Sequence, residues 1–209
     1  CGWGNTGSAG GDMTKMCVAV AIPCFKVTRH VMAVLDAIPV SVDRIYAVDD
    51  ACPDGSGAFI KAHCIDPRVQ VIFHDENQGV GGAIATAYRQ AIKDDVDIVV
   101  KIDGDGQMDP RLLPFFVRPI MLGLADYTKG NRFFRPESVV GMPFVRLFGN
   151  AALSFLTKLT CGYWRIMDPT NGYTAIHISA LRELPLEKIE KRYFFEGDVL
   201  FRLTTLRAV

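Results

Sequence analysis

The stretch VDIVVKIDGDGQMDP, residues 96–110, joins an apolar run directly to a group of carboxylates. The short run rich in Val and Ile is typical of a strand buried in a parallel sheet. In an extended segment, residues two apart point to the same side, so Asp103, Asp105 and Gln107 are expected to converge. Two carboxylates and an amide oxygen are hard ligands that suit Mg²⁺ or Mn²⁺. The stretch therefore predicts a buried strand that ends at a divalent metal site.

Two other interpretations explain part of this pattern. An EF-hand loop also has acids at its first and third positions, but it needs Gly at the sixth and Glu at the twelfth. Those places hold Met108 and Pro114 here, which excludes the calcium loop. Asp109 stands directly before Pro110, an order typical of a helix N-cap followed by proline in the first turn. Asp109 is therefore predicted to cap a helix.

Outside this stretch, apolar runs alternate with helical patterns through the first two thirds of the chain. Strands are expected at 16–23, 44–50, 69–75 and 96–103. Helices are expected at 27–38, 57–64 and 80–95, and a helix broken by proline at 109–124. This alternation indicates an α/β fold with a mostly parallel central sheet and helices on both faces. The pattern is looser after residue 125, and a last helix is expected after RYFFEGD, residues 192–198.

Acids also follow other predicted strands. Asp49 and Asp50 end the second strand, and Asp75 ends the third. In open parallel sheets, ligands bind beyond the carboxyl ends of the strands. Carboxylates gathered at one edge repel one another unless a cation or a hydrogen-bonding ligand is present. The sequence therefore predicts a metal-dependent ligand site at this edge.

The composition excludes several classes of protein. The 209 residues suffice for one well-packed domain. Lys+Arg and Asp+Glu balance at 23 each, so nucleic acid is not expected as a partner. The six cysteines form no CxxC pair, which favours reduced thiols over disulfides or a zinc site. NQGVGGA, residues 77–83, lacks the Lys-Ser/Thr of a P-loop and does not match GxGxxG.

The two ends of the chain and the apolar segment 143–160 each predict a further feature. Residues 1–15 are expected to form a flexible, Gly-rich leader, and residues 16–209 a catalytic domain truncated at its C-terminus. No uncharged apolar run reaches 18 residues, so no transmembrane span is expected. Residues 143–160 form a helical pattern with a narrow polar stripe. This helix is expected either to pack on the core or to lie in a membrane interface.

Several segments together carry a resemblance to a known family. They are VAVAIPCFK (18–26), YAVDDACPDGSG (46–57), ENQGVGGAIATAY (76–88), VVKIDGDGQMDP (99–110), KGNRF (129–133), DPTNGYTAI (168–176) and YFFEGDVLFRL (193–203). In this order they resemble family 2 glycosyltransferases of the GT-A fold, a Rossmann-like α/β fold. Within the family they are most similar to the branch of dolichol-phosphate mannosyltransferases and bacterial polyprenyl-phosphate glycosyltransferases. The resemblance covers roughly residues 16–206.

The resemblance implies a site for a nucleotide-diphosphosugar donor, a UDP- or GDP-sugar. Residues implied to contact the base and ribose are Pro23, Asp49, Asp50 and Asp103. Residues implied to hold Mg²⁺ or Mn²⁺ against the diphosphate are Asp103, Asp105 and Gln107. Arg132 matches a basic residue that the family places near the phosphates, and Arg146 is a second, weaker candidate.

The same resemblance implies residues on the acceptor side. Asp168 and the segment 171–173 match a stretch that shapes this side of the family's site. Asp198 is the candidate for taking the acceptor's proton or holding the acceptor, with Glu196 as the nearby alternative. Asp198 also fits a purely structural role as an acid at a helix start. With Asp105 and Arg132, Asp198 completes the expected catalytic set.

The implied reaction is an inverting, metal-dependent transfer of a sugar to a polyprenyl phosphate at the cytoplasmic face of the membrane, with peripheral membrane contact. A hydroxyl of a glycan or lipopolysaccharide is the alternative acceptor, and a non-catalytic sugar-nucleotide-binding module is a remote alternative. A sugar-1-phosphate nucleotidyltransferase is disfavoured, because IPCFKVTRH, residues 22–30, contains no glycine. The sequence leaves open whether the chain forms a homo-oligomer.

Two departures from the family pattern bear on the donor. The family's first motif often reads Tyr-Asn-Glu, whereas this chain has Phe25-Lys26-Val27 and so lacks an acidic contact to the base. The usual Gly-Ser after the paired aspartates is Ala51-Cys52. The choice between UDP and GDP therefore stays open.

Overall fold

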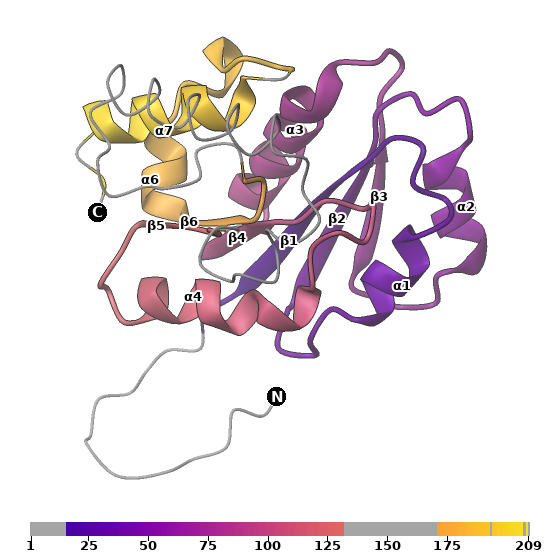
Figure 1. The fold of residues 1–209 in the computed structure, drawn as a ribbon, viewed down its shortest axis with the longest axis horizontal. Coiled ribbons are helices and arrows are strands. Elements are labelled where there is room, and N and C mark those ends of the chain that lie inside the picture. The colour runs from indigo at the N-terminus through magenta and orange to yellow at the C-terminus, as the bar shows by residue number, and fades with distance from the viewer. Residues whose placement is uncertain (1–15, 132–170, 193, 207, 209) are drawn as a thin grey trace, which may run out of the picture.

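The computed structural model describes residues 16–131, 171–192, 194–206 and 208. Among the described residues is a six-stranded sheet with the order β3-β2-β1-β4-β6-β5 (Figure 1). The predicted leader, the predicted helix at 143–160, and Arg132, Arg146 and Asp168 lie outside the described residues.

Four parallel strands form most of the sheet, as the sequence predicts. They are β1 (Val18–Cys24), β2 (Arg44–Asp49), β3 (Val69–Phe73) and β4 (Ile98–Lys101). Strand β1 pairs in parallel with β2 on one side and with β4 on the other, and β2 pairs in parallel with β3. The chain therefore changes direction across the sheet between β1 and β4. In open parallel sheets, ligands usually bind at such a change of direction, beyond the carboxyl ends of the strands.

Two short strands extend the sheet beyond β4. They are β5 (Tyr127–Lys129) and β6 (Thr174–His177). Strand β6 pairs antiparallel with β4 and also antiparallel with β5. Neither strand is predicted by the sequence pattern, because three or four residues are too few to show a periodicity.

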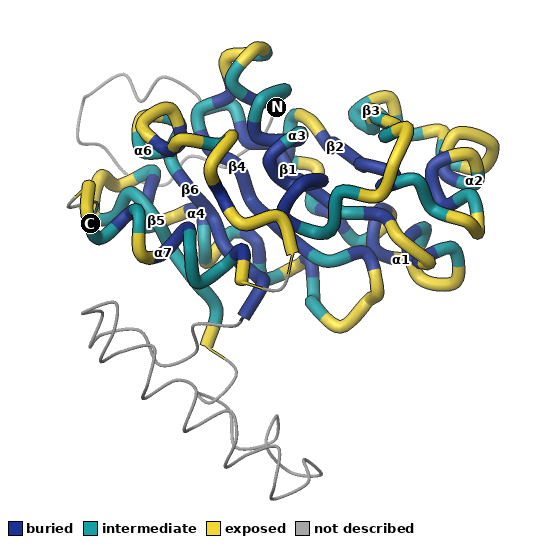
Figure 2. The backbone as a smooth tube through the Cα atoms, turned by 90° about the horizontal axis from the view of Figure 1, so that it is seen from above, coloured by how far each residue is buried: buried dark blue, intermediate teal, exposed yellow. Residues whose placement is uncertain are grey.

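Helices cover both faces of the sheet, as predicted. One face carries α1 (Val31–Asp36), α2 (Ser56–His63) and α4 (Leu113–Met121), which follows the 3₁₀ turn η1 (Pro110–Leu112). The other face carries α3 (Gly79–Lys93), α6 (Ile178–Glu183) and α7 (Phe195–Thr205), with the 3₁₀ turn η4 (Leu186–Lys188) between the last two. Buried residues concentrate in the central strands and exposed ones in the connecting loops (Figure 2).

The alternation of side chains along β1 explains how the two faces differ. Val20 and Ile22 point into the core beneath α1 and α4. Ala19 and Ala21 point to the opposite core, beneath α3. Helix α3 contributes the small side chains of Ala83, Ala87 and Ala91 to this second core.

Two predictions about the helix at 109–124 have separate outcomes. The cap is confirmed, because the Asp109 carboxylate accepts a hydrogen bond from the Arg111 N–H at 3.0 Å. The break by proline is found only as the short turn η1 ahead of α4, and Pro119 lies inside α4. Proline at this point removes one helical hydrogen bond but does not end the helix.

Two helical glycines provide a matched test of packing. A Cβ on Gly81 would lie 2.5 Å from the Glu190 carbonyl oxygen, whereas a Cβ on Gly197 would meet nothing within 4 Å. We expect Gly81→Ala to lower the free energy of unfolding by about 1–3 kcal/mol, because α3 must move away from residue 190. Gly197→Ala is expected to raise it by about 0.5–1 kcal/mol through lost chain entropy. Chemical denaturation of both variants checks the pair, and equal effects would contradict this account of the packing.

Candidate active site

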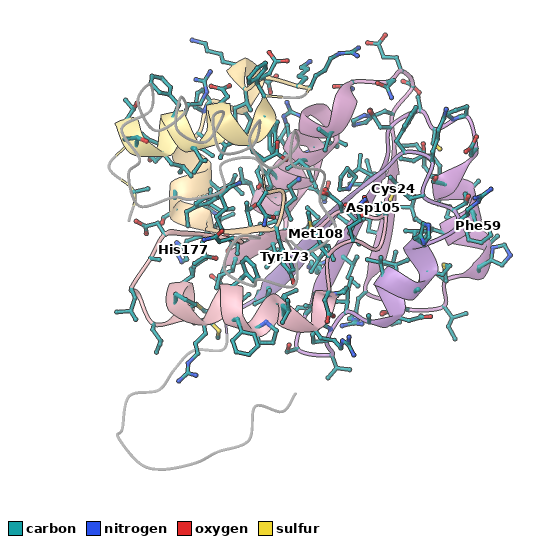
Figure 3. The ribbon with its side chains drawn as sticks, viewed as in Figure 1. Cys24, Phe59, Asp105, Met108, Tyr173 and His177 are labelled. Atoms are coloured by element: carbon teal, nitrogen blue, oxygen red, sulfur yellow. The ribbon has the colours of Figure 1, made fainter. Side chains whose placement is uncertain are left out.

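The loop after β4 lies against the loop after β1, at the predicted edge of the sheet. A Cβ on Gly104 would lie 3.3 Å from the Ile22 side chain and 3.5 Å from the Pro23 carbonyl oxygen. Figure 3 labels Asp105 on this loop and Cys24, the last residue of β1. The structure therefore brings the acidic loop to the direction change between β1 and β4.

Asp49 is buried, with 4% of its surface exposed, at the end of β2. Its carboxylate accepts hydrogen bonds from the Cys52 N–H at 2.7 Å and from the Gly57 N–H. Gly57 lies in the first turn of α2, whose unpaired N–H groups need acceptors. Asp49 therefore holds the start of α2 against the end of β2.

Asp50 is also buried, with 3% of its surface exposed, and it holds the start of α3 against the end of β2. Its carboxylate accepts from the backbone N–H groups of Gln78 and Gly79, each at 2.8 Å. A ring nitrogen of His74 lies 2.7 Å from the same carboxylate, and the other ring nitrogen lies 2.9 Å from the Thr86 hydroxyl. Asp50 thus joins β2, β3 and α3 at the strand ends.

Cys52 lies on the same edge. Its sulfur accepts a hydrogen bond from the Lys26 N–H at 3.1 Å and lies 3.1 Å from the Ser56 hydroxyl. Partial burial alone would raise the pKa of the Cys52 thiol, but hydrogen bonds from Ser56 and from backbone N–H groups outweigh it and lower the pKa. Cys52 stands where the family usually has a serine, and its sulfur makes a polar contact to the loop after β1.

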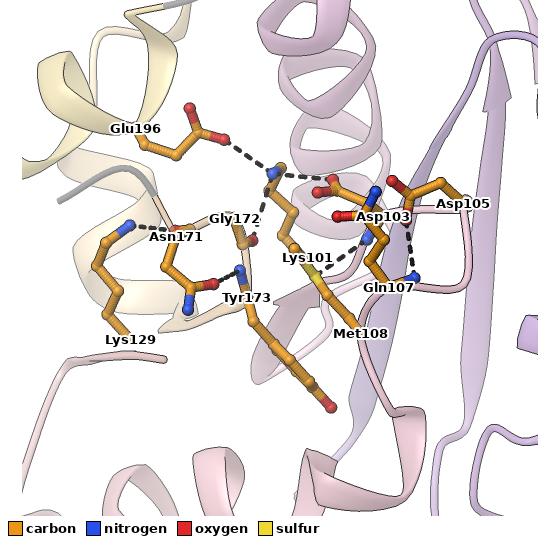
Figure 4. A network of polar contacts seen from close by, with 10 residues as sticks. All are labelled: Lys101, Asp103, Asp105, Gln107, Met108, Lys129, Asn171, Gly172, Tyr173 and Glu196. Atoms are coloured by element: carbon orange, nitrogen blue, oxygen red, sulfur yellow. Dashed lines mark hydrogen bonds and ion pairs between the residues drawn. The ribbon is translucent and has the colours of Figure 1, made fainter. Parts of the chain in front are cut away.

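Asp103 belongs to a network around the buried Lys101 (Figure 4). The Lys101 ammonium donates to Asp103 Oδ1 at 3.1 Å, to the Gly172 carbonyl oxygen at 3.3 Å and to Glu196 Oε1 at 2.8 Å. Burial alone would lower the pKa of Lys101, but the charges of Asp103 and Glu196 outweigh it and raise the pKa. Lys101 is therefore a charged side chain that links three segments.

Asp105 and Gln107 lie beside Asp103 on the same loop (Figure 4). Both are exposed, and the Asp105 carboxylate accepts a hydrogen bond from the Gln107 N–H at 3.0 Å. No group of three or more His, Cys, Asp or Glu residues in the described part of the chain is arranged to hold a metal ion. Asp103, Asp105 and Gln107 supply two carboxylates and one amide, a set that fits Mg²⁺ or Mn²⁺ whose other ligands come from substrate and water.

The segment 171–173 lies against Lys101 on the side away from Asp105. Lys129 donates to the Asn171 carbonyl oxygen, and Asn171 Oδ1 accepts from the Tyr173 N–H at 2.9 Å. The Tyr173 ring stacks on Phe116 with centroids 4.0 Å apart. These contacts fix the backbone carbonyl of Gly172 that Lys101 binds.

The two acids at the start of α7 have different surroundings. Asp198 accepts from the Glu190 N–H at 2.8 Å and from Arg202 Nε at 2.9 Å. Glu196 instead accepts from Lys101. The structure thus places Glu196 in the network with Asp103, whereas Asp198 pairs with residues of its own helix and the preceding loop.

Sequence reasoning named neither Lys101 nor Lys129 as a site residue. The one local signal for Lys101 was a charged residue at the end of an otherwise apolar strand. Its partners, Gly172 and Glu196, lie 71 and 95 residues away in the sequence, so no local pattern could connect them.

The geometry can be compared with known proteins. The family model described as glycosyl transferase family 2 matches residues 20–185. The chain is a family 2 glycosyltransferase. This glycosyltransferase is 32% identical to the undecaprenyl-phosphate mannosyltransferase of Micrococcus luteus over 173 residues, covering 82% of the chain and 69% of that protein.

Other relatives support the same branch and the same fold. The glycosyltransferase is 29% identical to the UDP-N-acetylglucosamine–dolichyl-phosphate N-acetylglucosaminyltransferase of Methanococcus voltae, covering 87% of the chain and 77% of that protein. Glucosyl-3-phosphoglycerate synthase from Mycobacterium tuberculosis, solved with Mn²⁺, UDP and phosphoglyceric acid, aligns with a TM-score of 0.71 at 20% identity. That alignment covers 98% of this chain and 71% of the synthase. The predicted polyprenyl-phosphate branch and GT-A fold are confirmed.

One expectation about membranes can be examined in the described residues. None of the helices in the described part of the glycosyltransferase has the length and apolar character needed to cross a bilayer.

The role of Asp50 at the helix start can be tested by its removal. Asp50→Ala leaves the N–H groups of Gln78 and Gly79 and the ring of His74 without their shared acceptor. We expect the free energy of unfolding to fall by about 2 kcal/mol, because three partly buried donors lose their shared acceptor. Asp36→Ala, at an exposed site on α1, is the control and should change it by less than about 0.5 kcal/mol. If a urea titration gave equally small effects for Asp50→Ala and Asp36→Ala, Asp50 would not be holding the start of α3 against the strand ends.

Proposed function

We propose that this glycosyltransferase moves a sugar from a nucleotide-diphosphosugar to a polyprenyl phosphate in a divalent-metal-dependent, inverting reaction. We infer the acceptor from the similarity to two enzymes whose names specify dolichyl phosphate and undecaprenyl phosphate. The Asp103 loop at the direction change of the sheet supports a nucleotide site at this edge. The proposed setting is the cytoplasmic face of a membrane, which carries the lipid acceptor.

The donor nucleotide is proposed to bind between the ends of β1 and β2. Pro23 at the end of β1 and the buried pair Asp49 and Asp50 border this region. Because both carboxylates already bind helix N–H groups, their first role is to fix the walls of the nucleotide site. Direct hydrogen bonds from Asp49 or Asp50 to the base or ribose stay a prediction.

Asp103, Asp105 and Gln107 are proposed to hold Mg²⁺ or Mn²⁺ beside the diphosphate. When bound, the ion supplies positive charge to the nucleoside diphosphate as it leaves. Arg132 is proposed to stabilise the same charge, with Arg146 as a second candidate. Both arginines lie outside the described residues.

The acceptor is proposed to approach from the side of Gly172 and Glu196. A polyprenyl phosphate is already anionic, so its oxygen can attack the anomeric carbon without losing a proton. Attack opposite the leaving diphosphate inverts that carbon. A sugar hydroxyl would need a base, for which Asp198, paired with Arg202, and Glu196, paired with Lys101, are the two candidates.

A transfer assay tests the acceptor. We expect a lipid-linked, inverted sugar when the purified chain is given undecaprenyl phosphate, Mn²⁺ and a radiolabelled UDP- or GDP-sugar. Chelation of the metal should abolish the product, because Asp103, Asp105 and Gln107 alone leave the diphosphate charge unbalanced. Thin-layer chromatography and anomer-specific hydrolysis measure the outcome. Product on an oligosaccharide acceptor alone would favour the alternative reaction.

The metal ligands can be tested without an acceptor. Asp105→Asn removes one negative ligand from the loop and should weaken Mn²⁺-dependent binding of UDP or GDP at least about tenfold, equivalent to 1.4 kcal/mol. Asp109→Asn is the matched control on the same loop, since asparagine also caps helices. Calorimetric titration of nucleotide with and without Mn²⁺ gives both affinities. Unchanged binding in Asp105→Asn would remove this residue from the metal site.

A further inference from the structure

Lys101 has an unusual position for a lysine. It is the last residue of β4, an interior strand between β1 and β6, and it is 1% exposed. An ammonium has three donors, and Lys101 donates to three acceptors: Asp103 Oδ1, the Gly172 carbonyl oxygen and Glu196 Oε1. Every donor of the buried charge is therefore satisfied within the protein.

The three acceptors belong to three separate segments. Asp103 lies on the loop with the proposed metal ligands, Gly172 precedes β6, and Glu196 lies in the first turn of α7. Figure 4 shows the Lys101 ammonium between the side chains of Asp103 and Glu196. Two carboxylates facing one common point repel each other unless a cation separates them.

We propose that Lys101 is a positioning residue that fixes the metal-binding loop relative to the start of α7. This inference rests on the proposed function for its effect on turnover. The loop side holds the donor, and the side of Gly172 and Glu196 receives the acceptor. Lys101 thereby sets the distance and alignment between the two substrates without contacting either of them.

Gly172 shows that the space around the ammonium is closely fitted. A Cβ at this position would lie 2.5 Å from Lys101 Nζ and 3.0 Å from Asp103 Oδ2. Only glycine lets the backbone carbonyl approach the ammonium this closely. Gly172→Ala therefore displaces the ammonium while it leaves all three charges in place.

Hydrogen exchange tests the positioning directly and needs no substrate. In Lys101→Met, the amides of residues 103–108 and 195–199 should both exchange faster, whereas those of β1, β2 and β3 should not change. Gly172→Ala should affect the same two segments, which keeps the test valid if Lys101→Met does not fold. Lys93→Met, at an exposed site on α3, is the control and should match the wild type. An effect on only one of the two segments, or on neither, would overturn the proposal.

Turnover separates positioning from a purely structural role. The concentration of folded Lys101→Met protein is measured by titrating its Mn²⁺-dependent binding sites for UDP or GDP. The transfer rate is then divided by this concentration of sites. At saturating nucleotide and Mn²⁺, we expect transfer per site to fall at least about 50-fold, since small displacements of reacting groups have effects of this size. A lower melting temperature with unchanged transfer per site would overturn the proposal.

Failure of the proposed function is recognised separately. If the wild-type chain transfers no sugar to lipid or glycan acceptors, the proposed function is wrong. The exchange pattern then decides the role of Lys101 by itself: joint loosening of 103–108 and 195–199 supports the link, and its absence overturns it.

Discussion

The buried ammonium of Lys101 is the contact on which the shape of the candidate site depends. A charge removed from water is strongly destabilising unless it is fully paired, so Asp103, Gly172 and Glu196 must meet at this point. The antiparallel strand β6 makes this meeting possible, because its register places Thr174 opposite Lys101 and so brings Gly172 to the strand's end. The two short strands β5 and β6 therefore extend the sheet and also position Gly172 in the candidate site.

A second constraint acts at the other half of the edge. The starts of α2 and α3 need acceptors for their free N–H groups, and Asp49 and Asp50 supply them. The same acids that resemble nucleotide ligands thus build the walls of the proposed nucleotide site. A rigid wall and a ligand contact are compatible roles, since each carboxylate oxygen can accept more than one hydrogen bond.

Local patterns predict the four parallel strands, the covering helices and the cap at Asp109, because each depends on residues close together in the chain. They miss β5 and β6, which are too short for a period, and Lys101, whose partners are distant in sequence. Local patterns also leave open the choice between Asp198 and Glu196. Residues two apart on a helix point roughly 200° apart, so only the docking of α7 decides which acid faces Lys101. The roles of Arg132 and Arg146 stay predictions.

The charges around Lys101 also bear on the chemistry. Of the charged side chains drawn in Figure 4, Asp103, Asp105 and Glu196 carry three formal negative charges and Lys101 and Lys129 carry two positive ones, which leaves one negative charge in excess. A bound cation would offset this excess, which supports the proposed metal dependence on physical grounds. The donor's diphosphate and an acceptor phosphate add further negative charge. Since Lys101 is already bound by two carboxylates, that added charge needs another cation, and Arg132 is the residue that we expect to provide it.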